Sequence, residues 1–455
     1  MKKRIFTGTL AVLMCIFAAS CAAPADTEKK ADGDSVKLAF WHTWNDEDLI
    51  HDIEEYNKDN DDNINVEVKV VTGDYRQSVD LAISSGNTPD IITALGPSQV
   101  KTLAEKNNII PLTEYLTPEL MEQYEQGFET KVNGVTYGVA GTSYIRRMLY
   151  NADLFREAGL DPDKPPKTLD EMLDAARKIT EAGAGEYYGM ALPLAAPDVI
   201  RTQFVYRVAM PTLGTAGYIN SQDKYDFTIF TPIVEKLQQA YNDKVFMPGS
   251  ATLNMDQDAV QFAAGKVGMT ILTSGFATKF GMIEDLEYDF DMRSCDIPAM
   301  GDIKYHHVIE APGAQVIMSG SNHQDEAWKV IEWMMSIGRA QKTQRVLYSE
   351  VPFNKEVFAK QEEYFRKSPS SELFKIDMDD YKSETLLPAP VSLELQGDGD
   401  SKTFANIILS NLDVNEELTL LSQRYNDALA RAESEGKCKI SDYHLEEGEN
   451  PLLIK

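Results

Sequence analysis

The chain has 455 residues, of which 72 are aspartate or glutamate and 44 are lysine or arginine, so its formal charge at pH 7 is −28. A strongly acidic surface disfavours binding to nucleic acid and docking on anionic lipid, so we expect neither kind of partner. The length exceeds that of one ordinary hydrophobic core, which predicts two lobes.

The first 21 residues indicate export from the cytoplasm. The basic residues 2–4 precede an apolar stretch at 5–17, and AASC follows at 18–21. This order is typical of a signal peptide, and the apolar stretch is too short for a permanent membrane span. Small residues before a cysteine resemble the lipobox of bacterial lipoproteins, although Ala18 stands where leucine is commoner. The resemblance implies removal of residues 1–20 and lipidation of Cys21, for example with palmitate. The alternative is an ordinary signal peptide with an unrelated cysteine.

The next segment, residues 22–35, has no periodicity, and alanine is its only apolar residue type. Such a segment buries too little surface to offset its ordering entropy. We therefore expect residues 21–35 to be a lipidated cysteine and a flexible tether. The body of the protein would stand outside the cytoplasmic membrane, which it would touch only through the lipid anchor.

Residues 36–95 predict an α/β fold. The apolar run 36–41 is expected to be a strand, 46–58 a helix, 64–71 a half-buried strand at a sheet edge, 75–85 a helix ending at Gly86, and 90–95 a third strand. This order predicts parallel strands joined by helices, with ligands at the carboxyl ends of the strands. The loop that follows the first strand, 41–45, would therefore lie at a ligand-binding edge.

The later part of the chain is expected to be mixed α/β. An extended run covers 141–151, and a helix begins at Thr168 with a capping box to Glu171. Further patterns predict strands at 267–272 and 313–318 and helices at 325–338 and 414–435, with a polar break at 397–402.

Two groups of side chains suit sugar binding. Trp41, His42 and Trp44 would present flat apolar faces with polar tips, which suits the C–H faces and hydroxyl groups of a sugar ring. Either tryptophan could instead pack in the core. Of the adjacent Arg146 and Arg147, only one can face a cleft from a strand, and its guanidinium fits vicinal hydroxyls or a carboxylate. A surface salt bridge is the alternative for this pair.

Signals for metal binding and catalysis are weak. His306 and His307 with Glu310 resemble a metal cluster in composition, but no further ligand spacing supports one, so we expect no metal and no cofactor. The sequence contains no Gly-x-Ser-x-Gly or His-Glu-x-x-His motif and no glycine-rich phosphate loop. A binding protein is favoured over an enzyme, although a glycosidase carboxylate pair stays open. A disulfide between Cys295 and Cys438 also stays open.

In chain order, several segments resemble the extracellular solute-binding protein family 1, the carbohydrate-binding partners of ABC importers. The most specific is LYNADLFREAGLDPDKPPKTLDEMLDAARKI at 149–179, and the others are FWHTW at 40–44, ISSGNTPDIITA at 83–94, VNGVTYGVA at 132–140, SGFATKF at 274–280, GAQVIM at 313–318 and SEVPFN at 349–354.

The resemblance implies the two-lobed, type II periplasmic-binding-protein-like fold with a multi-strand hinge. The N-terminal lobe would hold 36–141 plus 311–345, and the C-terminal lobe 146–306 plus 350–440. The chain would cross between the lobes near 142–145, 307–312 and 346–350.

The resemblance also implies a set of ligand-binding residues. Phe276, after Gly275, takes the position where most members of the family stack an aromatic ring on the ligand. The other positions implied are Trp41, His42, Trp44, Asp90, Tyr144, Arg146 and Gly313.

The predicted function is a lipid-anchored, monomeric solute-binding protein that delivers a sugar or oligosaccharide to the permease subunits of an ABC importer. Hinge closure around the unchanged ligand would be its mechanism. The alternatives are a surface glycoside hydrolase and a ligand-sensing partner of a membrane receptor. The sequence does not specify the sugar, its length or its linkage.

Overall fold

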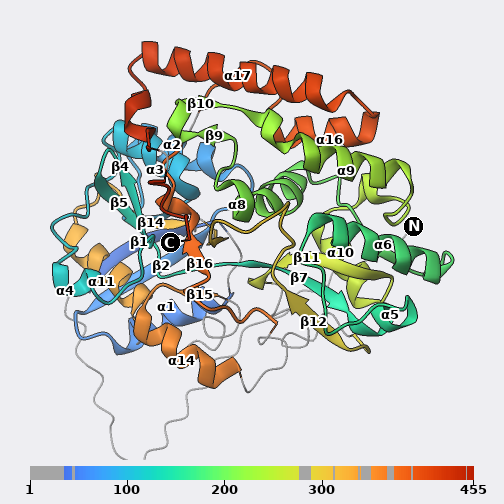
Figure 1. Cartoon of the computed structure of the whole chain (residues 1–455). Coiled ribbons are helices and arrows are strands. Elements are labelled where there is room, and N and C mark those ends of the chain that lie inside the picture. The colour runs from blue at the N-terminus through green and yellow to red at the C-terminus, as the bar shows by residue number, and fades with distance from the viewer. Residues whose placement is uncertain are drawn as a thin grey trace, which may run out of the picture. The chain divides into compact units, whose positions relative to one another are not determined.

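A computed structural model describes residues 35–43, 47–275, 288–310, 313–336, 339, 350–365, 373–390, 393–446 and 448–454 (Figure 1). The predicted signal peptide and Cys21 lie outside the described residues, as do Trp44 and Phe276. Residues Val36–Lys455 form one compact unit, which contains two main sheets.

The first sheet has six strands in the order β2-β1-β3-β14-β5-β4. The three strands β2, β1 and β3 are parallel as predicted, because β1 pairs in parallel with both β2 and β3, and β2 lies at the predicted edge. The strands β14, β5 and β4 pair antiparallel, so the sheet is mixed. The bounds are β1 (Val36–His42), β2 (Ile64–Val70), β3 (Ile91–Ala94), β4 (Glu129–Val132), β5 (Val135–Val139) and β14 (Ala314–Ile317).

Helices cover both faces of this sheet. Alternation along β1 sends Leu38 and Phe40 into a core with α1 (Glu47–Asp59) and α11 (Gln324–Met335). Trp41 points to the opposite face, where α2 (Tyr75–Ser85) and α3 (Gly96–Glu105) pack. The predicted end of α2 is confirmed, since Gly86 adopts a φ of 71° and caps the helix with its backbone N–H. The short α4 (Pro118–Met121) follows later.

The second sheet has four strands in the order β12-β7-β11-β8. The strand β7 pairs antiparallel with β11 and β12, and β8 pairs in parallel with β11. The capping box predicted for α6 is present, with the Thr168 side chain and Glu171 satisfying each other's backbone N–H groups. The elements here are β7 (Arg146–Asn151), α5 (Ala152–Glu157), α6 (Leu169–Gly183), β8 (Tyr188–Met190), α10 (Met255–Ala263), β11 (Val267–Thr273) and β12 (Met292–Cys295).

A mainly helical region packs against this second sheet and buries many aromatic rings, among them Phe204, Phe227, Phe230 and Phe404. Figure 1 shows α17 running along α16, β9 and β10. The elements are α7 (Pro197–Val199), η1 (Ile200–Tyr206), α8 (Arg207–Leu213), β9 (Tyr218–Ile219), η2 (Asn220–Gln222), β10 (Lys224–Tyr225), η3 (Phe227–Phe230), α9 (Thr231–Asn242), η4 (Ser250–Thr252), α16 (Asp400–Ser410), α17 (Val414–Ser434) and η7 (Ile440–Tyr443).

Three segments lie side by side between the two sheets. β6 (Thr142–Ser143) pairs antiparallel with β15 (Val351–Pro352). The backbone N–H of Glu310, which follows β13 (His307–Ile309), donates to the carbonyl of Tyr144, and the Ser143 hydroxyl donates to the carbonyl of Glu310. We call these segments, 142–144, 307–310 and 350–352, the three crossings, after the predicted passages between the lobes, which stay a prediction. β13 also pairs with β16 (Tyr381–Ser383), which η6 (Glu384–Leu386) follows, while α14 (Lys355–Phe365) follows β15.

Two sequence expectations need correction or completion. The polar break expected at 397–402 is wrong in its second half, because α16 begins at Asp400 and buries Phe404 and Ile408. The first turn of α16 consists of the polar residues Asp400, Ser401 and Lys402, which is why composition alone predicted a break there. The disulfide that stayed open does not form, since Cys295 and Cys438 are free thiols, and burial raises the pKa of Cys295 to about 12.

Candidate ligand-binding cavity

A cavity of about 1120 Å³ lies between the β4–β5 side of the first sheet and segments from later in the chain. Its lining comes from α3 and residues within 127–134 on one side, and from residues within 201–216, 384–389 and 442–451 on the other. Arg146 and Glu310, which adjoin the three crossings, complete the lining. Ligand sites of this size bury most of a drug-sized molecule, so the space suits a small solute or a short oligosaccharide.

A tight hairpin turn shapes the first wall. Asn133 and Gly134 join β4 to β5 with φ values of 51° and 77°. Two consecutive residues with positive φ match the right-handed twist of the flanking strands, which is why Asn-Gly favours this position. This turn places Lys131 and Asn133 at the cavity.

A π-helical segment supplies the opposite wall. α7, η1 and α8 run continuously, and within them the N–H of Arg207 donates to the carbonyl of Thr202, five residues earlier. Arg201, Tyr206 and Arg207 all line the cavity from this stretch. π-Helical turns widen a helix and are frequent at functional sites.

Two arginines and two glutamates form a network at the cavity. Arg146 Nε pairs with Glu310 Oε1, and Arg207 Nη2 lies 3.9 Å from that same oxygen. Arg207 Nη1 also lies 2.9 Å from Glu384 Oε2. Burial lowers the pKa of Arg146, and the charge of Glu310 offsets this only in part. Burial also acts to lower the pKa of Arg207, but Glu384 and Glu310 outweigh it and hold the pKa above its ordinary value.

The third arginine, Arg201, is more loosely paired. Its guanidinium nitrogens lie 3.6 Å from Asp198 Oδ1 and 3.8 Å from Asp400 Oδ2, beyond hydrogen-bond distance. Its guanidinium carbon lies 5.6 Å from the centre of the Tyr206 ring. The Tyr206 hydroxyl donates a hydrogen bond to Asp400 Oδ2, so this carboxylate oxygen already has a hydrogen-bond partner other than Arg201.

The end of the chain closes one side of the cavity. Leu452 is fully buried, and its carbonyl accepts the N–H of His306. Asn450 Nδ2 donates to the carbonyl of Gly214 at 2.8 Å. These contacts fix the segment after α17, so that Tyr443 and Leu445 line the cavity.

Of the predicted site residues that the structure describes, Arg146 alone lines this cavity. Its neighbour Arg147 instead donates to Asp296 Oδ1 at 2.7 Å, and Tyr381 donates to the same oxygen at 2.6 Å. The expectation that only one of the two arginines faces a cleft is thus matched by the geometry.

Trp41 and His42, which were predicted to bind the ligand, both pack against other residues of the first sheet and its helices. Trp41 is partly buried against the α2–α3 side of the first sheet, and Lys69 Nζ lies 4.3 Å from its ring centre. His42 is buried at the end of β1, with Nδ1 3.0 Å from Thr93 Oγ1. Trp44, the third member of this predicted group, lies outside the described residues.

Asp90 joins β1, β3 and the end of β14 to one another. One carboxylate oxygen accepts the backbone N–H of Ala39 at 2.8 Å, and the other accepts the hydroxyl of Ser321. It precedes β3, whereas Gly313 precedes β14 and so lies next to the carboxyl end of β3. Because β14 runs antiparallel, the two residues lie at opposite ends of β3.

Tyr144 belongs to the first crossing. Its hydroxyl donates to Glu350 Oε1 at 3.2 Å, and the Thr142 hydroxyl donates to the other oxygen of that carboxylate. Glu350 is buried, so it ties the first crossing to the third.

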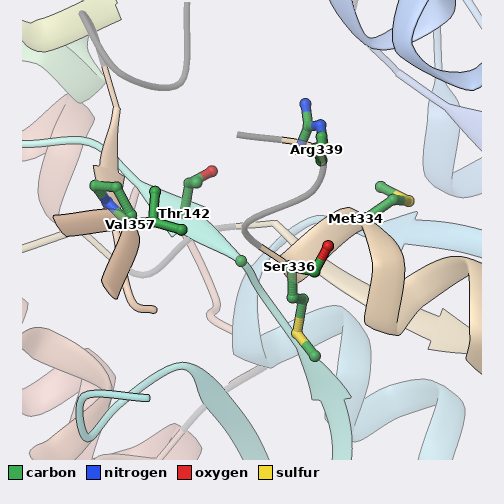
Figure 2. A pocket seen from close by; sticks show the side chains of 8 residues that line it. Thr142, Met334, Ser336, Arg339 and Val357 are labelled. Carbon is green, nitrogen blue, oxygen red and sulfur yellow. The ribbon is translucent and has the colours of Figure 1, made fainter. Parts of the chain in front are cut away.

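A second, much smaller pocket lies beside these crossings. Figure 2 shows Thr142, Met334, Ser336, Arg339 and Val357 around it. Its volume is about 10 Å³, which is near the lower limit for one water molecule and far too small for a sugar.

His307 and Glu310, two of the three residues considered as metal ligands, have different partners. His307 stacks on Tyr381, with ring centres 5.4 Å apart, and burial lowers its pKa. Glu310 faces the arginines instead. Within the described ranges, no group of three or more His, Cys, Asp or Glu side chains is arranged to hold a metal ion. Among those same residues, no helix has the length and apolarity needed to span a bilayer.

Sequence reasoning did not identify Arg201, Arg207 and Glu384 as site residues. Arg201 and Arg207 are six positions apart, which is not a spacing that brings side chains to one face of a regular α-helix. Only the π-helical segment and distant pairing with Glu310 and Glu384 reveal their common site.

Solved structures with the same fold include proteins that bind sugars. The sugar-binding protein MalE of Xanthomonas citri matches 89% of this chain and 100% of its own, at 16% identity and a TM-score of 0.68. An ABC transporter solute-binding protein of Thermotoga lettingae, bound to α-D-tagatose, matches 87% and 100% at 22% identity and a TM-score of 0.67. These likenesses confirm the predicted two-lobed type II fold.

Curated relatives share more sequence over shorter spans. A binding protein of Brucella abortus (strain 2308) is 28% identical over 287 residues, 62% of this chain, and the chain spans 66% of that relative's length. The sn-glycerol-3-phosphate-binding periplasmic protein UgpB of the same strain is 28% identical over 160 residues, 32% of this chain and 37% of its own. Residues 45–338 match the family described as bacterial extracellular solute-binding protein. The chain belongs to the bacterial extracellular solute-binding protein family.

Proposed function

We propose that this protein binds a sugar or short oligosaccharide in the cavity of about 1120 Å³ and delivers it unchanged to an ABC importer. The observation that supports this most directly is the origin of the cavity walls. One wall comes from the first sheet, the other comes from segments after β7, and the three crossings lie between the sheets.

Hinge motion follows from this arrangement. A ligand that touches both walls gains its full set of contacts only when they approach each other, so binding favours a closed state. The three crossings would absorb the change, which is the domain-closure mechanism known for this class of protein. The permease subunits would then recognise the closed, liganded form.

The ligand test is calorimetric titration of the mature protein with a panel of neutral and charged mono- and oligosaccharides, with X-ray scattering in parallel. The expected result is binding of at least one carbohydrate, a smaller radius of gyration in its presence, and recovery of the carbohydrate unchanged. Hydrolysis of the bound sugar would favour the glycoside hydrolase alternative. A folded protein that binds no member of the panel would overturn the proposal.

We also propose that lipidated Cys21 anchors the protein on the outer side of the cytoplasmic membrane. The full-length chain should partition with membranes and incorporate a palmitate analogue, whereas Cys21→Ser should incorporate none and be released. Cys15→Ser is the matched control, because that cysteine lies within the predicted signal. Equal lipid incorporation by Cys21→Ser and the unsubstituted chain would contradict the anchor.

A further inference from the structure

Three arginines gather at one end of the cavity in a chain with a formal charge of −28. The cavity lining contains five basic side chains, Lys101, Lys131, Arg146, Arg201 and Arg207, and five acidic ones, Glu129, Glu310, Glu384, Asp442 and Glu449. The cavity is therefore far less negative than the chain as a whole. This local balance of charge lowers the barrier to an anionic ligand.

The arginines keep hydrogen-bond donors unused. Nη1 of Arg146, Nε of Arg201 and Nε of Arg207 are buried and have no hydrogen-bond acceptor among the described residues. Nε of Arg146 is buried too and has only its ion pair with Glu310. The side chains of Arg146 and Arg207 are 12% and 10% exposed, so water reaches them poorly. A buried donor without an acceptor costs free energy, and the cost is larger for a charged group.

The two nearest carboxylates do not satisfy these donors. Glu310 is shared between Arg146 and Arg207, and Glu384 pairs with Arg207 on its other side. Arg201 has its acidic neighbours beyond hydrogen-bond distance. The cluster thus has donors for at least one more acceptor, and guanidinium groups match carboxylate and phosphate oxygens in geometry.

We propose that this end of the cavity binds the anionic group of a sugar or polyol, either a carboxylate or a phosphate, through Arg146, Arg201 and Arg207. The inference rests on the proposed function and specifies the substrate class of the same site. Burial lowers the pKa of Arg146, as described above, and an incoming anion would counteract that effect.

The test compares matched ligands by calorimetry on the mature protein. The first set is glucose, glucuronate and glucose 6-phosphate, the second is galactobiose and digalacturonate, and the third is glycerol and sn-glycerol 3-phosphate. We expect at least one anionic member to bind about tenfold or more tightly than its neutral counterpart. The preferred anion distinguishes a carboxylate source from a phosphate source. Higher salt should weaken the anionic ligand more than the neutral one.

Arg146→Gln provides the variant and Arg147→Gln the control, because the adjacent Arg147 pairs with Asp296 outside the cavity. Arg146→Gln should weaken anionic binding about 10- to 100-fold, and at least about tenfold more than it weakens binding of the neutral counterpart. Arg147→Gln should leave both unchanged. If Arg146→Gln fails to fold, Arg201→Gln replaces it, since that side chain is 32% exposed.

The outcomes separate the two proposals. Neutral sugars that bind as tightly as their anionic counterparts would overturn the anion site and leave the sugar-binding function intact. Anionic binding that Arg146→Gln leaves unchanged would also overturn it. Failure of every neutral and anionic carbohydrate to bind would overturn the proposed function itself.

Discussion

Replacement of Asp258 by asparagine should stabilise the protein at high pH and much less at low pH. Asp258 is buried on α10, and the Thr270 hydroxyl of β11 donates to its Oδ2 at 2.7 Å. Burial raises the pKa of this carboxyl from 3.8 to about 7, although the bond from Thr270 lowers it in part. Between pH 3.8 and about 7, the Asp258 carboxyl is therefore mostly protonated in the native state and mostly ionised in the unfolded chain.

The sign and size follow from proton linkage. Below pH 3.8 the carboxyl is neutral in both states, and stability falls as pH rises toward 7 because only the native state holds the proton. At about 1.4 kcal/mol per pKa unit, the full cost is about 4 kcal/mol above pH 7, of which about 1.5 kcal/mol is present at pH 5. The stability advantage of Asp258→Asn should therefore grow by about 2–3 kcal/mol between pH 5 and pH 8.

Urea denaturation followed by circular dichroism at pH 5, 6, 7 and 8 measures this difference, since other titrating groups cancel between the variants. Asp256→Asn is the matched control, because this carboxylate is exposed on the same helix. Its effect should stay within about 0.5 kcal/mol at every pH. A constant difference between Asp258→Asn and the unsubstituted protein from pH 5 to pH 8 would refute the reasoning.

Three further substitutions test the hinge and the first sheet. Glu350→Gln should lower the free energy of unfolding by about 1–3 kcal/mol, because it weakens charge-assisted bonds from the two hydroxyl groups of the first crossing; unchanged urea midpoints would contradict this. Gly127→Ala should destabilise more than Gly134→Ala, since both have positive φ but only at Gly127 would the new Cβ lie 2.2 Å from Ser383 Cβ. Trp41→Ala should lower the melting temperature by several degrees, because the indole packs against the α2–α3 side of the sheet. Calorimetric titration of the same variant tests the predicted ligand-binding role of Trp41.

Much of the fold could be predicted because local patterns and tertiary packing agree. The alternation in β2, the glycine cap of α2 and the capping box of α6 are short-range signals, and each appears where the sequence predicts it. The mixed character of the first sheet was not predictable in this way. The antiparallel pairing of β14 with β3 joins residues more than 200 positions apart.

The candidate site was less accessible to sequence reasoning for the same reason. Arg146 could be suggested because it interrupts an apolar strand, but its partner Glu310 lies 164 positions away. Arg201 lies in the π-helical η1 and Arg207 directly follows it as the first residue of α8, an arrangement that no periodicity indicates. The residues carried over from the family, such as Trp41 and Asp90, lie in the first sheet and away from the cavity lining. Their role in ligand binding stays a prediction.

The segment that follows α17 belongs to neither main sheet, yet Tyr443, Leu445 and Glu449 line the cavity of about 1120 Å³. Buried Leu452 is one of a few residues that hold this segment in place. The other residues of the segment can therefore be substituted without disturbing the register of a strand or one of the three crossings. Under the proposed function, substitutions in this stretch would change ligand preference and leave the two main sheets and the three crossings intact. The same freedom makes it a convenient place for a reporter dye that senses occupancy.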